Sequence, residues 1–155
     1  MYSEFIHLRV HSDFSMMDGL NKVKPLLDEC VKQEMPAIAL TDQMNMCGLV
    51  KFYSEAHNRG IKPIIGTDFW VQDLSQSDDI FRLTLLATNN DGYKNITVLI
   101  SKAYQRGHVN HLPVIDKDWL IEHQAGVLIL SGATRGDVGQ ALVKNNLKGA
   151  QQMAA

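Results

Sequence analysis

Short apolar segments alternate with amphipathic helical patterns along this chain, and this alternation restricts the fold more than any other feature of the sequence. The segments typical of strands are residues 6–10, 37–41, 62–65, 83–87 and 127–131, with a resumption at 68–71 after a break at Gly66. The helical patterns cover residues 22–33, 49–58, 91–103 and 137–144, with a short turn at 118–122 that Asp116 caps and loops at 42–47, 73–79 and 105–113. Strands that alternate with helices are typical of an α/β protein with parallel strands.

The size of the chain limits how much of such a fold it can complete. Its 155 residues are enough for one domain with a substantial core. The count of about five strands is too small for a closed parallel barrel, which typically needs roughly 250 residues. We therefore expect residues 1–155 to form a single domain that is incomplete at its C-terminal end. An unclosed barrel leaves a strand edge open, and such an edge favours self-association.

Composition excludes several classes of protein. The formal net charge of −2 provides no field for gripping the phosphate backbone of a nucleic acid. No apolar run reaches transmembrane length, and residues 1–4 lack the basic and apolar regions of a signal peptide. Cys30 and Cys47 show neither a CxxC motif nor the spacing of a zinc site. These features favour a reduced, cytoplasmic protein without a membrane segment.

Polar residues that can bind a metal ion or a phosphate follow several of the predicted strands. His11, Asp42, Asp68 and the segment 131–137 lie at or just after the C-terminal end of a strand. In parallel α/β folds, functional sites form at that edge of the sheet. The loop after the first strand adds Asp18, so the sequence predicts a site around His11.

Arg9 limits what this site can bind. It lies two residues before His11 and therefore faces the same side of the predicted strand, as does His7. A histidine in place of Arg9 would make a His-x-His metal pair, whereas an arginine stays protonated and has only hydrogen-bond donors. The sequence therefore indicates a metal site that has lost a ligand.

Several motifs, separated along the chain, occur in a specific order. They are His7-Leu8-Arg9-Val10-His11-Ser12, Asp18-Gly19, Ala39-Leu40-Thr41-Asp42, Asn45-Met46-Cys47-Gly48, Lys62-Pro63-Ile64-Ile65-Gly66, Leu85-Leu86-Ala87, Gly92-Tyr93-Lys94-Asn95 and Leu130-Ser131-Gly132. Each motif alone is weak, but their joint order is highly specific. Over nearly its whole length the chain thus resembles the N-terminal polymerase-and-histidinol-phosphatase (PHP) domain of bacterial DNA polymerase III alpha subunits.

The resemblance implies a distorted, TIM-like barrel of seven βα units, of which this chain is the N-terminal part. In active relatives, two or three metal ions, often zinc or manganese, lie at the C-terminal strand ends, where phosphoesters are hydrolysed. In alpha subunits the domain precedes the polymerase region, and in some branches it docks the separate proofreading exonuclease.

The family's ligand pattern is only partly present when it is matched residue by residue. The positions that keep a ligand type are His11, Asp18, Asp42 and Asp68, the last in place of a glutamate. The positions where a family histidine is replaced are Arg9, Gln43 and Arg82. Two of these replacements add a fixed positive charge, which opposes a cation a few ångströms away by several kcal/mol.

Two interpretations of these residues follow. In the first, His11, Asp18, Asp42 and Asp68 hold a divalent ion, and the oxygen-rich set suits magnesium or manganese better than structural zinc. In the second, Arg9 and Arg82 pair with Asp42 and Asp68 and leave a site that is neutral without a metal. We favour the second interpretation, in which no cofactor is needed.

The resemblance favours a structural and docking module that acts in DNA replication. Its partners would be the rest of the polymerase alpha subunit and the proofreading exonuclease, and it would meet DNA through the longer protein. That longer protein would be a DNA-directed DNA polymerase, a nucleotidyltransferase whose catalytic aspartates lie outside this chain, so this chain alone is expected to be inactive. The alternative is a working metal-dependent phosphoesterase, such as a pyrophosphatase or a 3′–5′ exonuclease, that uses metal ions to activate water.

Overall fold

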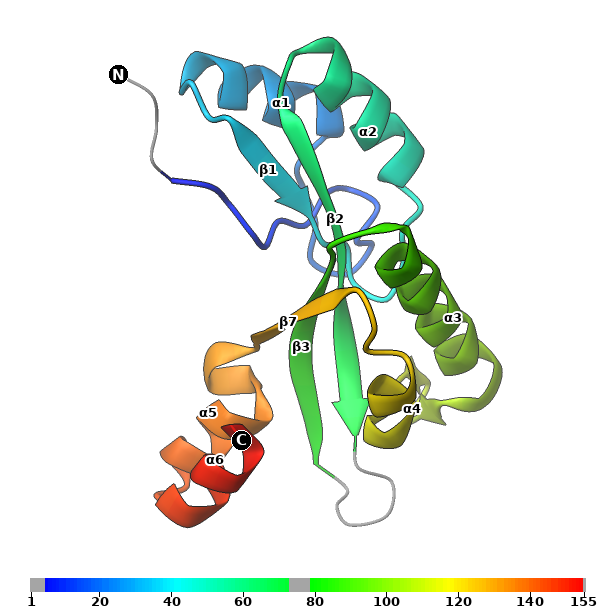
Figure 1. Ribbon diagram of the computed structural model, residues 1–155, viewed down its shortest axis with the longest axis vertical. Coiled ribbons are helices and arrows are strands. Elements are labelled where there is room, and N and C mark those ends of the chain that lie inside the picture. Colours follow the sequence, from blue (N-terminus) through cyan, green and yellow to red (C-terminus); the bar gives the residue numbers. More distant parts are fainter. Residues whose placement is uncertain (1–4, 73–78, 155) are drawn as a thin grey trace. The chain divides into compact units, whose positions relative to one another are not determined.

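The computed structural model describes residues 5–72 and 79–154 (Figure 1). It divides into two compact units, Met1–Asp68 and Phe69–Ala155. The expectation about a signal peptide concerns residues 1–4, which lie outside the described ranges. So does the predicted polar loop at 73–79, apart from Asp79.

The first unit contains a parallel strand pair and two helices. Its elements are α1 (Val23–Lys32), β1 (Ala37–Leu40), α2 (Leu49–Asn58) and the beginning of β2 (Lys62–Gln72). The register of β1 and β2 runs from Ala37 opposite Lys62 to Leu40 opposite Ile65. Both helices and β1 confirm the predicted elements to within one residue at each end.

The predicted break in β2 at Gly66 is wrong. β2 runs without interruption from Lys62 to Gln72. Beyond the part that pairs with β1, Asp68 makes a parallel bridge with Gln43 in the loop after β1. Because the strand has a pairing partner on each side of Gly66, backbone hydrogen bonding keeps it extended where the residue type favours a break.

The core of the first unit lies between the two helices and β1, and Figure 1 shows α1 and α2 beside each other. Its fully buried side chains include Val23 and Leu27 of α1, Ile38 of β1, and Phe52 and Ala56 of α2. The spacing of four residues within each helix places these side chains on one stripe. Tyr53 is 54% exposed, because it lies one position around the helix from Phe52.

The predicted strand at 6–10 is wrong as a regular strand, although the segment does run beside β1. The carbonyls of His7 and Val10 accept from the backbone N–H groups of Ala39 and Thr41, each at 2.8 Å. The N–H of Val10 donates to the Thr41 hydroxyl at 3.0 Å. Since a side chain here replaces a backbone acceptor, the ladder is interrupted.

The second unit begins with the end of β2 and alternates further strands and helices. Its elements are β3 (Ile80–Ala87), α3 (Asn90–Arg106), β4 (His108–Val109), β5 (Leu112–Pro113), β6 (Ile115–Asp116), α4 (Lys117–Glu122), β7 (Val127–Ser131), the 3₁₀ turn η1 (Ala133–Arg135), α5 (Asp137–Val143) and α6 (Leu147–Ala154). The predicted loop at 105–113 therefore contains two short antiparallel strands. Asp116 caps α4 as predicted, because its carboxylate accepts from the Asp118 N–H at 3.2 Å.

The expectation of an all-parallel sheet is wrong. β6 pairs with β2 in parallel, through Val71 opposite Ile115, whereas β7 pairs antiparallel with β3 from Leu83 opposite Ser131 to Ala87 opposite Val127. Apolar periodicity shows that a segment is a strand but not which way it runs beside its neighbour. The α/β class holds, with a mixed sheet in place of a parallel one.

Helix α3 covers part of the second unit's sheet. Ile96, Leu99 and Ala103 are buried along one side of it, and the helix packs against β3, β6 and β7. No helix in the described ranges has the length and apolar character needed to span a membrane.

Candidate functional site

A compact loop between residues 11 and 21 forms the framework of the site. The Ser15 N–H donates to the Ser12 carbonyl at 2.9 Å, and the Gly19 N–H donates to the Ser15 carbonyl at 2.8 Å. Gly19 is needed here because a Cβ at this position would overlap the Ser12 carbonyl oxygen. The tight turn brings Asp18 back beside His11.

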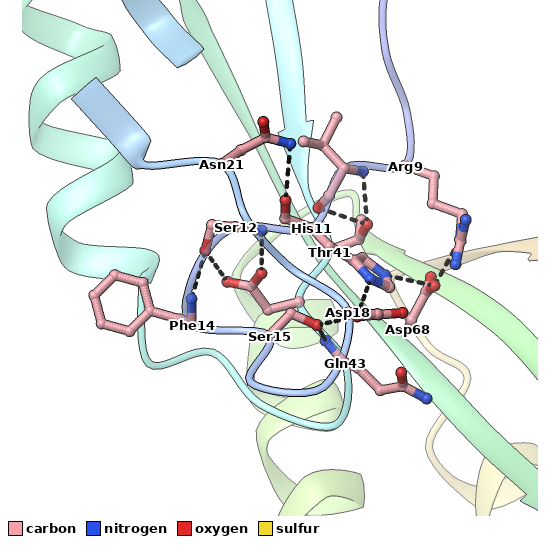
Figure 2. Close-up of polar contacts among 12 residues, drawn as sticks. Arg9, His11, Ser12, Phe14, Ser15, Asp18, Asn21, Thr41, Gln43 and Asp68 are labelled. Carbon is pink, nitrogen blue, oxygen red and sulfur yellow. Dashed lines mark hydrogen bonds and ion pairs between the residues drawn. The ribbon is translucent and has the colours of Figure 1, made fainter. Parts of the chain in front are cut away.

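His11 lies between two carboxylates in Figure 2. Its Nδ1 is 2.7 Å from Asp18 Oδ1, and its Nε2 is 2.8 Å from Asp68 Oδ2. The Ser15 hydroxyl donates to the same Asp18 oxygen at 2.8 Å. The Asp68 side chain is fully buried, and the His11 side chain is 9% exposed.

Arg9 reaches the same buried carboxylate. Its Nε donates to Asp68 Oδ2 at 2.6 Å, while 47% of the arginine side chain stays exposed. The prediction that Arg9 and His11 face the same side is confirmed, since both contact one oxygen of Asp68. We refer to Arg9, His11, Asp18 and Asp68 as the His11 cluster.

The geometry favours a doubly protonated His11. An ionised carboxylate only accepts hydrogen bonds, so an imidazole that bonds two carboxylates must donate from both nitrogens. Burial alone would lower the pKa of His11, but the hydrogen bonds to Asp68 and Asp18 and their charges outweigh it and raise the pKa above its usual value. The cluster then contains two positive and two negative side chains and is neutral by itself.

Asp42 is buried but belongs to a different set of contacts. One of its oxygens accepts from the Ser12 N–H at 2.6 Å and the other from the Ser12 hydroxyl at 2.8 Å. Burial raises the pKa of Asp42, and the bonds from Ser12 partly oppose this shift. The prediction that an arginine pairs with Asp42 is wrong, because the serine that begins the loop takes that position. Asp42 anchors the loop to the end of β1.

The structure gives the other predicted residues different contacts from those proposed for a metal site. The Gln43 backbone N–H donates to the Ser15 hydroxyl at 3.2 Å, and Figure 2 shows its side chain extending away from His11. Arg82 is buried in the second unit, where its guanidinium lies 4.6 Å from the centroid of the Trp70 ring. His7 is exposed and packs edge-on against Phe5, with ring centroids 4.8 Å apart, so it does not line the site.

Sequence reasoning missed Asn45. Its amide group donates to the carbonyls of Phe14 and Gln43, at 3.1 and 3.0 Å, and so ties the loop of the site to the loop after β1. An asparagine after a strand is a common turn residue, so nothing in the sequence separates this role from an ordinary turn.

The described side chains do not fit a metal ion in this arrangement. Both nitrogens of His11 already face carboxylates, and the Asp68 oxygen that His11 contacts, Oδ2, also accepts from Arg9. Within residues 5–72 and 79–154, no group of three or more histidine, cysteine, aspartate or glutamate side chains is placed to hold a metal. The Arg9 guanidinium instead places a positive charge beside the buried Asp68 carboxylate.

Comparison with known proteins agrees with this combination of fold and motifs. The PHP domain family matches residues 7–155. The chain belongs to the PHP domain family. Its curated PHP relatives include DNA polymerase III subunit alpha of Vibrio cholerae, 63% identical over 143 residues, and that of Escherichia coli K12, 56% identical over 142 residues. In both cases the match covers 92% of this chain and 12% of the relative, so the chain spans about an eighth of their length.

Solved structures support the fold at low sequence identity. An amidohydrolase from Chromobacterium violaceum aligns with a TM-score of 0.56 at 14% identity and covers 95% of this chain and 73% of its own. A two-domain protein from Bacteroides vulgatus, described as containing a predicted PHP-like metal-dependent phosphoesterase, aligns with a TM-score of 0.52 at 14% identity, over 90% of this chain and 41% of its own.

Proposed function

We propose that this chain is the N-terminal PHP domain of a replicative DNA polymerase III alpha subunit and serves it as a structural and docking module. The His11 cluster carries the structural part of this proposal. Its buried carboxylate is neutralised by Arg9 and His11, with Asp18 balancing the imidazolium. The identity to alpha subunits over 92% of the chain supports the polymerase assignment.

The cluster acts as an internal brace, by which we mean a set of ion pairs that joins the N-terminal segment to β2. Asp68 comes from β2, whereas Arg9 and His11 come from the N-terminal segment that runs beside β1. The ion pairs therefore join segments 57 and 59 residues apart in the chain. Removing a partner would leave a buried charge unpaired, which is costly, so the brace holds the N-terminal segment in place.

The fold of the longer domain is part of the same proposal. Residues 1–155 would be the N-terminal part of one distorted (β/α)₇ TIM-like barrel, incomplete at its C-terminal end. The alignment of 95% of this chain with 73% of the amidohydrolase supports this interpretation.

The partners follow from the polymerase assignment. The domain would contact the rest of the alpha subunit and the proofreading exonuclease, and would meet DNA through the longer protein in the cytoplasm. The longer protein would be a DNA-directed DNA polymerase that acts in replication, while this chain alone would not polymerise.

A titration of the exonuclease onto this chain tests the docking role. Absence of binding at tens of micromolar would contradict docking by this segment.

A second candidate function is a metal-dependent phosphoesterase, of pyrophosphatase or 3′–5′ exonuclease type. It is favoured by the retention of His11, Asp18, Asp42 and Asp68 at ligand positions of the PHP pattern. It would need magnesium, manganese or zinc to displace Arg9 from Asp68 and a proton from His11.

Elemental analysis together with a hydrolysis assay distinguishes the two functions. The purified chain is equilibrated with Mn²⁺ or Zn²⁺, freed of excess metal, and assayed on a generic phosphodiester. We expect no stoichiometric metal and no turnover. Stoichiometric metal with turnover that Asp42→Ala abolishes would establish the phosphoesterase instead, and Asp116→Ala, which alters a helix cap in the second unit, is the matched control.

A further inference from the structure

The dipeptide Asp-Gly occurs twice in this chain, at Asp18-Gly19 in the site loop and at Asp91-Gly92 near the beginning of α3. At such a dipeptide the glycine nitrogen can attack the carboxyl group of the aspartate, because the glycine has no side chain to hinder the approach. This reaction converts aspartate to isoaspartate without an enzyme. Each dipeptide is therefore a candidate site of spontaneous modification.

Neither glycine can be replaced without moving the backbone around it. A Cβ at Gly19 would overlap the Ser12 carbonyl oxygen, and a Cβ at Gly92 would overlap the Gly126 carbonyl oxygen. The close packing that requires a glycine thus also places the reactive residue after each aspartate. Protection of the two aspartates then depends on the hydrogen bonds that hold each dipeptide.

At Asp18 the reacting groups are held within one turn of the site loop, as Figure 2 shows for the side chains. The N–H groups of Gly19 and Asp18 donate to the Ser15 carbonyl, at 2.8 and 3.1 Å. Asp18 Oδ1 accepts from the Ser15 hydroxyl at 2.8 Å and lies 2.7 Å from His11 Nδ1. The turn does not continue into a helix, and the Asp18 side chain is 37% exposed.

At Asp91 the corresponding groups belong to a long helix. Helix α3 has 17 residues, and Asn89 Oδ1 accepts from the N–H groups of Asp91 and Gly92, each at 3.0 Å. Gly92 is buried, whereas the Asp91 side chain is 77% exposed. Side-chain exposure alone would make Asp91 the more reactive residue. Release of the Gly92 nitrogen, however, requires a packed helix to unwind, whereas release of the Gly19 nitrogen requires only an isolated turn to open.

We propose that Asp18 is the residue of this chain that isomerises spontaneously, through local opening of the site loop. The Gly19 nitrogen bonds to Asp18 Cγ, and the hydroxyl of the carboxyl group leaves with the amide proton as water, which gives a succinimide ring. Water that adds to the ring at the main-chain carbonyl of Asp18 breaks the original peptide bond. The product is isoaspartate of unchanged mass, in which the backbone passes through the former side chain. Its carboxylate is shorter by a methylene group and retracts from His11.

The test compares the rates of isoaspartate formation at Asp18 and Asp91 in the folded chain with the rate in a free peptide of residues 15–21. After incubation at neutral pH over several weeks, peptide mapping with electron-transfer fragmentation quantifies isoaspartate at each position. We expect the free peptide to react at least about tenfold faster than Asp18 in the chain, because local opening must precede the reaction there. Asp18 should in turn react at least about tenfold faster than Asp91. In guanidinium chloride, which unfolds the chain, the two positions should react at similar rates.

Two variants connect the reaction to the contacts of each dipeptide. Ser15→Ala removes the hydroxyl bond to Asp18 and should accelerate isomerisation at Asp18 about three- to tenfold, without a change at Asp91. Asn89→Ala removes the cap of α3 and should accelerate the reaction at Asp91 alone. Circular dichroism verifies that both variants are folded.

The comparison within the unmodified chain decides the proposal even if a variant fails to fold. Isoaspartate that forms at Asp91 as fast as at Asp18 would overturn it, because the site loop would then not be the easier segment to open. An Asp18 without detectable isoaspartate over the whole incubation would overturn it as well. A rate at Asp18 equal to that of the free peptide would show that the contacts with Ser15 and His11 do not restrain the reaction, and would also contradict the proposal.

Discussion

At the scale of single residues, the His11 cluster is built around one buried carboxylate, that of Asp68. Arg9 and His11 both contact one buried oxygen of Asp68, and His11 also bonds Asp18. Sequence spacing predicted the side shared by Arg9 and His11, because residues two apart in an extended segment face the same way. It did not predict that Ser12 would satisfy Asp42, because that contact depends on how tightly the loop between them folds.

His11 makes stability depend on pH. Its pKa in the folded chain lies above the ordinary value of 6.5, so its stabilising contribution is complete below about 6.5 and is lost as the pH rises through the raised pKa. Urea unfolding should therefore show a falling free energy of unfolding above pH 6.5, by at most about 1.4 kcal/mol per pH unit. His11→Asn should remove this dependence. An identical pH profile in the variant would contradict the imidazolium assignment.

Arg9 should stabilise the fold by more than an ordinary surface arginine. Arg9→Ala removes a charged hydrogen bond to a fully buried carboxylate, and we expect a loss of about 1–2 kcal/mol, moderated by the half-exposed arginine. Chemical denaturation measures the loss. The exposed Arg106, in the last turn of α3, provides the control, since Arg106→Ala should cost less than about 0.5 kcal/mol. Similar losses for the two variants would show that the pair with Asp68 contributes little.

At the scale of elements, apolar spacing predicted α1 to α5 but missed α6. α2 was predicted with its observed bounds, because Phe52 and Ala56 fall on one stripe and Gly60, with φ +70°, follows its C-terminal end. The direction of β7 could not be predicted, since alternation carries no information about parallel or antiparallel pairing. The continuity of β2 through Gly66 could not be predicted from the sequence either, because it depends on the bridge between Gln43 and Asp68.

We expect the site loop not to tolerate a side chain at Gly19. In Gly19→Ala the new methyl group would overlap the Ser12 carbonyl oxygen, so the loop must shift, at a cost of about 1–3 kcal/mol. Gly60→Ala is the comparison that separates steric overlap from backbone strain, because Gly60 has a positive φ but open space around it. This substitution should lower the free energy of unfolding by about 1 kcal/mol. Thermal unfolding compares the two variants. If Gly19→Ala is the milder substitution, the compact loop geometry is wrong.

At the scale of the whole molecule, we expect the chain to fold without a metal ion, because Arg9 and His11 already pair with the buried Asp68 carboxylate. Chelation by EDTA is expected to leave the melting temperature unchanged, and added Zn²⁺ should not raise it, because a ligand stabilises only when it binds the folded state. Differential scanning calorimetry with and without each reagent measures this. A melting temperature that falls on chelation would mean that a metal ion is part of the folded structure.

The central claim is that His11 is an imidazolium held by two carboxylates, where a metal ligand would be a neutral imidazole. Nitrogen-15 NMR of the histidine rings at neutral pH tests it most directly, with the His11 signals assigned among the six histidines by their absence in His11→Asn. The account predicts protons on both ring nitrogens of His11 and no change when equimolar Zn²⁺ is added. A single unprotonated nitrogen whose resonance moves with Zn²⁺ would contradict it and restore a metal site to this domain.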